Sequence, residues 1–251
     1  MCGSEAGKIQ NSQSSYEQPS QGQSSHGQPL GERKAVRGVA LDMDGLLFDT
    51  EKLYWQVGDT LLQRRGFRFS IELQQRMMGR IGVSAIQQMI DMHSLSDSAV
   101  SLLAESDVIY GALLNQPPDG MPGLDEWIAL LIDSKIPFGL ATSSRRVFVD
   151  RIFENVSWRD SLSFVLTGDD VNNGKPHPEM YLKAAEKFSI DPTEMLVLED
   201  SGNGCAAAVA AGAQTVAIPS EHTQTQDFSG AVLVAESLAD SRLWSLVRHC
   251  E

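Results

Sequence analysis

The stretch "VALDMDGLLFDTE", residues 39–51, places two acids at the end of an apolar run. The apolar start predicts a buried β-strand, and Asp42 and Asp44 follow it directly. Two carboxylates this close repel each other, so a counter-charge is expected beside them, or one would be pushed to its neutral form. Gly45 allows the backbone to turn after the pair, and the two side chains therefore need not share one role.

Further apolar runs of the same kind follow along the chain, at residues 136–144, 163–170, 194–201, 213–220 and 231–238. They do not alternate strictly between polar and apolar residues, which is typical of strands that are buried on both faces of a parallel sheet. Helical patterns lie between them, at residues 123–135, 177–189 and 203–213. This alternation predicts an α/β fold with a doubly wound, Rossmann-like parallel sheet.

Two of these helical patterns also indicate which helix face is buried. In the first, the expected apolar face is formed by Leu124, Trp127, Ile128 and Leu131. In the second, it is formed by Met180, Leu182, Ala184, Ala185 and Phe188. Both faces are expected to pack against the sheet.

The interval between the first two strands carries helical stripes only, at residues 53–66, 71–79, 83–93 and 99–114. We therefore expect an all-helical cap at 51–119, with hinges at 49–51 and 115–123. The α/β catalytic core then comprises residues 35–50 and 120–251. Residues 1–34 are rich in Gln, Ser, Gly and Pro and are expected to form a disordered tail.

Composition limits the partners of the chain. The formal net charge of -13 argues against non-specific binding to nucleic acid or to anionic membranes, which require basic surfaces. No apolar run approaches the roughly 18–20 residues that span a bilayer. The three cysteines, Cys2, Cys205 and Cys250, are too sparse for a disulfide framework and suit a reducing cytoplasm. We expect a cytoplasmic monomer without nucleic-acid or membrane partners.

Polar side chains follow four of the predicted strands. They are Asp42 and Asp44 after the first strand, Thr142, Ser143 and Ser144 after the second, Lys175 in the loop after the third, and Glu199 and Asp200 at the end of the fourth. Each one alone could be an ordinary helix cap or turn residue. Together they predict a site, because ligands of open α/β sheets bind at the carboxyl ends of the strands.

The chemistry of this set favours a hard cation and a phosphate. Several carboxylates that converge on one edge need positive charge between them. Mg²⁺ prefers oxygen ligands and is typically held by one or two carboxylates together with a substrate phosphate. The sequence shows no His and Cys spacing of the kind that binds zinc. Thr142 as a hydrogen-bond donor and Lys175 as a point charge would complete a phosphate cradle.

The segments "DMDGLLFDTE", "ATSS", "GKPHPEMY" and "LVLEDSGNG" together resemble the four ordered motifs of the haloacid dehalogenase superfamily. The likeness spans residues 36–219 and is closest to the capped phosphatase and phosphomutase branch, especially phosphatases related to pseudouridine monophosphate phosphatase. It implies a Mg²⁺-dependent phosphomonoester hydrolase that works through an aspartyl phosphate. The substrate would be a small phosphorylated metabolite, either a sugar phosphate or a nucleotide-like compound.

The resemblance also implies a role for each matched residue. Asp42 corresponds to the nucleophile and Asp44 to the general acid and base. Thr142 and Lys175 correspond to the residues that bind the transferring phosphoryl group. Asp42 beside a cation and Lys175 is expected to keep a low pKa, whereas a like charge and burial are expected to raise the pKa of Asp44.

The implied Mg²⁺ ligands are Asp42, Asp44 through its backbone carbonyl, and Asp200. Glu199 is implied as a further ligand or as a neighbouring support. The third acid of the opening stretch, Asp49, is interpreted as part of the hinge and not of the catalytic set.

The same residues also distinguish this chain from proteins with other activities. Asp44 argues against dehalogenases and phosphonate hydrolases, whose resemblance to this chain ends at the nucleophile. A β-phosphoglucomutase-like hexose-phosphate mutase resembles the chain in every core motif, but it uses a hinge histidine where this chain has Tyr54. Ser143, Ser144, Arg80 and Arg145 are candidates for binding the substrate, including a second anionic group. A non-catalytic binding or regulatory protein is the alternative of another class, and the intact motifs argue against it.

Overall fold

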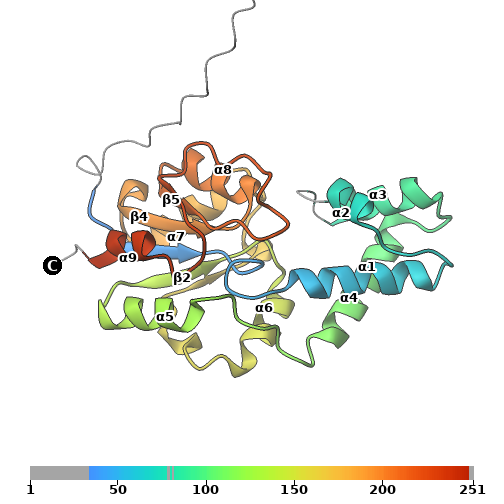
Figure 1. Cartoon of the computed structure of the whole chain (residues 1–251), viewed down its shortest axis with the longest axis horizontal. Coiled ribbons are helices and arrows are strands. Elements are labelled where there is room, and N and C mark those ends of the chain that lie inside the picture. The colour runs from blue at the N-terminus through green and yellow to red at the C-terminus, as the bar shows by residue number, and fades with distance from the viewer. Residues whose placement is uncertain (1–33, 78–79, 81, 249–251) are drawn as a thin grey trace, which may run out of the picture.

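The computed structural model describes residues 34–77, 80 and 82–248 of the 251-residue chain. The tail expected at 1–34 lies outside these residues except for Lys34. Figure 1 shows an α/β unit with a group of helices projecting from it. Among the described helices, none combines the length and the apolar character that a bilayer crossing needs.

The α/β unit is built on a parallel sheet, as predicted. Its strands are β1 Gly38–Leu41, β2 Phe138–Ala141, β3 Val165–Leu166, β4 Met195–Glu199, β5 Gln214–Ala217 and β6 Leu233–Val234. They lie in the order β3-β2-β1-β4-β5-β6, and every neighbouring pair is parallel. The order reverses at β1, which has β2 on one side and β4 on the other.

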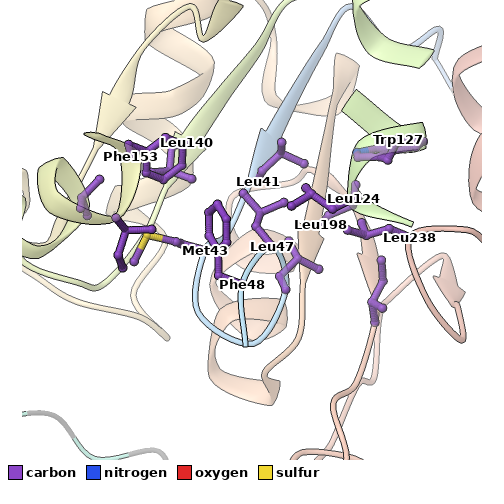
Figure 2. Packing of buried hydrophobic residues seen from close by; sticks show 14 of the residues in the cluster. Leu41, Met43, Leu47, Phe48, Leu124, Trp127, Leu140, Phe153, Leu198 and Leu238 are labelled. Carbon is purple, nitrogen blue, oxygen red and sulfur yellow. The ribbon is translucent and has the colours of Figure 1, made fainter. Parts of the chain in front are cut away.

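Helices cover both faces of the sheet. They are α5 Leu124–Asp133, α6 Arg146–Ile152, α7 Glu179–Phe188, α8 Gly202–Ala210 and α9 Ser241–Arg248. Leu41 of β1 packs in one core cluster with Trp127 of α5 (Figure 2), whereas Ala40 packs in a second cluster with residues of α7 and α8. Burial on both faces explains why the strands read as unbroken apolar runs.

The helix faces agree with the sequence in α5 and differ in α7. Leu124, Trp127, Ile128 and Leu131 are all buried, as expected. In α7 the inclusion of Leu182 is wrong, because its side chain is 40% exposed. Tyr181 is fully buried in its place, and the buried face is Met180, Tyr181, Ala184 and Ala185. A shift of one position rotates a helical side chain by about 100°, enough to leave the core.

Helix α9 has no counterpart among the sequence expectations. It is short and buries only Leu243 and Val247, so its apolar stripe is too brief to stand out from the flanking polar residues. Short 3₁₀ turns occur at Phe153–Asn155, Arg159–Ser161, Gly168–Asp170 and Pro192–Glu194.

The helical insert lies between β1 and α5. It consists of α1 Glu51–Gln63, α2 Ile71–Met77, α3 Val83–His93 and α4 Ala99–Leu113, which stand apart from the sheet in Figure 1. The chain segments that lead into and out of this insert run side by side. Asp49 N donates to Asp119 O at 2.9 Å, and Met121 N donates to Leu47 O at 2.9 Å. The insert is thus joined to the sheet by two chain segments that are hydrogen-bonded to each other, which we call the paired crossings.

Candidate active site

The polar residues singled out in the sequence meet at one edge of the sheet. Asp42 follows β1, Thr142 follows β2, and Glu199 ends β4 with Asp200 directly after it. This edge is where the strand order reverses, which is the place where open α/β sheets bind their ligands.

Lys175 is the cation of the site. Its Nζ donates to Asp42 Oδ1 at 2.5 Å, to Glu199 Oε1 at 2.6 Å and to the Ala141 carbonyl at 3.0 Å. The lysine side chain is only 6% exposed. Burial acts to lower the pKa of Lys175, but the charges of Asp42 and Glu199 outweigh it and raise the pKa. The ammonium group therefore stays charged and holds Asp42 in place.

Glu199 is fully buried, and both of its carboxylate oxygens have hydrogen-bond donors. Besides Lys175, the Tyr181 hydroxyl donates to Oε1 at 2.6 Å, and the Ser201 hydroxyl donates to Oε2 at 3.1 Å. Gly204 provides the room, because a Cβ atom there would lie 1.8 Å from Glu199 Oε1. This arrangement favours Glu199 as the support for Lys175.

Tyr181, Ser201 and Gly204 were not assigned roles from the sequence, although all three lie inside or beside the quoted motifs. The available signal was a tyrosine hydroxyl within an apolar helical stripe, since a buried hydroxyl requires a partner.

An acidic cluster lies beside the lysine. Carboxylate oxygens of Asp42, Glu199 and Asp200 all lie within 4.8 Å of one another. Burial, and then the neighbouring carboxylates, raise the pKa of Asp200 well above its usual value. Burial also raises the pKa of Asp42 to about 7, against the opposing charge of Lys175. The low pKa expected for Asp42 assumed a bound cation as well as Lys175, so it remains a prediction for the metal-bound protein.

The cluster fits a divalent cation with hard oxygen ligands. One lysine faces the carboxylates of Asp42, Glu199 and Asp200, so the site has an excess of buried negative charge. Gly45 keeps this space open, because a Cβ atom at that position would lie 2.6 Å from Asp200 Oδ2. Carboxylate oxygens in a compact group are the ligands that Mg²⁺ prefers.

Asp44 faces the hydroxyls that follow β2. Its Oδ2 accepts hydrogen bonds from Ser144 Oγ at 2.6 Å and from Thr142 Oγ1 at 3.2 Å. Its Oδ1 and the Thr50 hydroxyl oxygen are both buried and form no hydrogen bond of ordinary geometry, but the Thr50 hydroxyl lies close enough to lower the pKa of Asp44. Burial raises the pKa of Asp44, against the hydrogen bond from Ser144, in the direction expected from the sequence.

The other residues that the sequence suggested for substrate binding form no hydrogen bond or ion pair with the acidic cluster or Asp44. Ser143 is exposed. Arg80 is exposed too, and its Nε donates to the Arg76 carbonyl at 3.1 Å. Arg145 forms an ion pair with Asp107 of α4 and lies 5.6 Å from the centre of a phenylalanine ring of α6. It thus links the sheet unit to the helical insert.

Replacing Gly45 by alanine is expected to weaken Mg²⁺ binding by about 10–100-fold, because the new methyl group would displace Asp200. Gly45 also has a φ of +74°, so some loss of stability is expected as well. Gly66→Ala is the matched control, because Gly66 has a φ of +81° and nothing lies within 4 Å of its Cβ position. Mg²⁺ titrations followed by calorimetry would measure both variants. Equal Mg²⁺ affinities in the two variants would contradict this role of Gly45.

Comparison with known proteins agrees with this geometry. The family model for haloacid dehalogenase-like hydrolases matches residues 39–218. A probable pseudouridine-5'-phosphatase of Drosophila melanogaster is 32% identical over 215 residues, which cover 82% of this chain and 92% of that protein.

Two further proteins show how widely the fold is used. A bifunctional riboflavin kinase/FMN phosphatase of Arabidopsis thaliana is 29% identical over 217 residues, which cover 85% of this chain and 57% of that longer protein. The crystal structure of a β-phosphoglucomutase from Clostridium difficile has a TM-score of 0.70 at 18% identity, covering 84% of this chain and 97% of the other. At that identity the likeness concerns the fold.

Proposed function

The chain belongs to the haloacid dehalogenase-like hydrolases, and we propose that it is a Mg²⁺-dependent phosphatase that hydrolyses small phosphomonoesters through a phosphorylated Asp42. The observation that carries this proposal is the contact of Lys175 Nζ with Asp42 Oδ1 at 2.5 Å, beside the acidic cluster. This contact holds the Asp42 carboxylate at the carboxyl end of β1, with a permanent positive charge next to it. A nucleophile and a phosphoryl oxygen both require such a charge.

In the first step, a carboxylate oxygen of Asp42 forms a bond to phosphorus while the ester P–O bond breaks. The electron pair of the broken bond goes to the leaving oxygen, which takes a proton from the Asp44 carboxyl group and departs as an alcohol. In the second step, water attacks phosphorus and gives a proton back to Asp44. The bond to Asp42 then breaks, and inorganic phosphate is released.

Lys175 and Thr142 assist this reaction from the sides. The Lys175 ammonium group neutralises charge on Asp42 and on the phosphoryl oxygens, while Glu199 holds Lys175 in position. Thr142 is fully buried at the end of β2, and its hydroxyl would exchange the 3.2 Å hydrogen bond to Asp44 Oδ2, which is longer than the one from Ser144, for a hydrogen bond to a phosphoryl oxygen. Asp42, Asp200 and the Asp44 carbonyl would hold Mg²⁺, which supplies positive charge that offsets the carboxylates and the phosphate.

Hydrolysis is favoured over phosphoryl transfer within a sugar. The mutase alternative requires residues that bind a second phosphate, and both basic candidates for this role have other partners. Arg145 is paired with Asp107, and the Arg80 side chain donates to the Arg76 carbonyl of α2. We therefore propose substrates that carry a single phosphate, from the sugar-phosphate or nucleotide-like class.

We also propose that the protein is cytoplasmic and monomeric. The thiol of Cys205 is buried and free, as suits a reducing compartment.

The test is phosphate release by the purified full-length protein with Mg²⁺ from sugar phosphates, mononucleotides, alkyl phosphates and p-nitrophenyl phosphate. Release from at least one of them, lost in excess EDTA, is expected. A parallel assay of β-glucose 1-phosphate with a glucose bisphosphate primer measures mutase activity. Turnover only in that assay would replace the proposal with a mutase, and no turnover in any assay would contradict both.

Without metal, the free energy of unfolding is expected to fall as pH rises from about 4 to about 7. The pKa of Asp42 is about 7 in the folded protein against 3.8 ordinarily, so between these values the folded state holds a proton that the unfolded state has lost. Mg²⁺ should restore stability, and more strongly at pH 8 than at pH 5. Urea denaturation in EDTA and in Mg²⁺ across this range measures both effects. A Mg²⁺ effect of equal size at pH 5 and pH 8 would contradict the prediction.

A further inference from the structure

Ser144 stands out among the residues beside Asp44. It lies between β2 and α6, and its hydroxyl donates to Asp44 Oδ2 at 2.6 Å. Its backbone is fixed at both ends: the Ser144 amide donates to Thr142 Oγ1 at 3.1 Å, and the Ser144 carbonyl accepts from the Gly168 amide at 2.9 Å. A serine held in this way has its hydroxyl aimed at the carboxyl group before any substrate arrives.

The two oxygens of Asp44 differ sharply in their surroundings. Oδ2 takes both hydroxyl donors, from Ser144 and Thr142, and the Ser144 bond is shorter by 0.6 Å. Oδ1 is buried and forms no hydrogen bond of ordinary geometry, although the Thr50 hydroxyl is close to the carboxyl group. A carboxyl group that two hydroxyls hold through the same oxygen is kept in one orientation.

We propose that Ser144 is a positioning residue that holds Asp44 through Oδ2 and so fixes the orientation of this carboxyl group before it gives a proton to the leaving oxygen of the substrate. This inference rests on the proposed phosphatase function. It differs from the sequence-based expectation that Ser144 binds a second anionic group of the substrate. The Ser144 hydroxyl has one hydrogen to donate, and that hydrogen is committed to Asp44.

A fixed orientation of Asp44 also favours one class of substrate. An alkoxide is a poor leaving group and must receive a proton as its bond to phosphorus breaks, whereas p-nitrophenolate is stable as an anion. A site that orients its acid before substrate arrives is suited to phosphates of ordinary alcohols, such as sugar or polyol phosphates. Loss of the orienting bond should therefore affect alkyl phosphates selectively.

The experiment compares kcat/KM for an alkyl phosphate and for p-nitrophenyl phosphate in Ser144→Ala and Ser144→Cys. This ratio reports only the steps up to release of the alcohol, so hydrolysis of the intermediate does not affect it. We expect the alkyl phosphate value to fall by about 10²-fold or more, while the p-nitrophenyl phosphate value changes by less than about 3-fold. Ser144→Thr, which keeps a hydroxyl, should recover most of the alkyl phosphate activity.

Two controls separate positioning from general damage. Ser134→Ala, at an exposed serine after α5, should behave as the wild type with both substrates. The inhibition constant of inorganic phosphate should be unchanged in the Ser144 variants, because the phosphate site itself is intact.

The possible failures are distinguishable. An equal loss with both substrates, or no loss with either, would overturn the role of Ser144 while leaving the phosphatase function standing. A wild-type protein that hydrolyses neither substrate would overturn both.

Discussion

Asp42→Asn is expected to lower kcat for phosphate release by at least about 10³-fold, because the amide has almost the same shape but cannot act as the nucleophile. The contact with Lys175 can persist through the amide oxygen, so the geometry should be kept. Phosphate release with Mg²⁺ measures the loss. Acid quenching after incubation with a phosphate-labelled substrate should leave label on the wild type and none on the variant.

The stability of the same variant distinguishes loss of chemistry from loss of fold. Burial strongly disfavours the charged form of Asp42, so a neutral amide should make the metal-free protein more stable than the wild type at pH 8. Asp49→Asn is the matched control, since Asp49 forms an ion pair with Lys52 at 2.5 Å at the start of the insert. It should retain activity within a few-fold. Undiminished turnover in Asp42→Asn would contradict the proposed covalent intermediate.

Lys175→Met is expected to be the most destabilising single change at the site, by about 3–5 kcal/mol at pH 8 in EDTA. The Lys175 side chain is 6% exposed and contacts both Asp42 and Glu199, so its loss leaves two buried carboxylates without their cation. Activity should fall together with stability. Urea denaturation followed by circular dichroism measures the change.

Comparison with an exposed lysine gives this prediction its control. Lys183 pairs with Glu179 at 2.9 Å on the surface of α7, and Lys183→Met should cost no more than about 1 kcal/mol. Adding Glu199→Gln to Lys175→Met should recover part of the lost stability, because it removes one of the two unpaired charges. A Lys175→Met variant as stable as Lys183→Met would show that the buried ion pairs contribute little.

The sheet could be predicted from the sequence because a strand that is buried on both faces consists of consecutive apolar residues. Leu41 and Ala40 point to opposite faces, and both sides are covered, so apolar residues follow one another without interruption. The edge that carries the site followed from the same reasoning, because parallel strands bring their carboxyl ends together.

Other features depend on neighbours that the sequence does not reveal. The role of Tyr181 depends on how α7 is oriented about its axis. In the structure the Tyr181 hydroxyl faces Glu199, and Leu182 faces solvent. The pKa of Asp42 depends on how deeply it is buried relative to the strength of its contact with Lys175. The partner of Arg145 depends on where α4 lies, and a long exposed side chain has many possible partners.

The paired crossings connect the helical insert to the same loop that carries Asp44. The loop that carries Asp44 also carries Leu47, whose carbonyl accepts from Met121 in the returning crossing. The Gly45 amide donates to the Phe48 carbonyl at 2.9 Å within the same loop, so the acid and both crossings share one rigid turn. We therefore expect that lengthening, shortening or reshaping α1–α4 beyond this turn would leave Asp44, the proposed proton donor, where it is. On the proposed mechanism, substrate preference could then change through the insert while the chemical step stays the same.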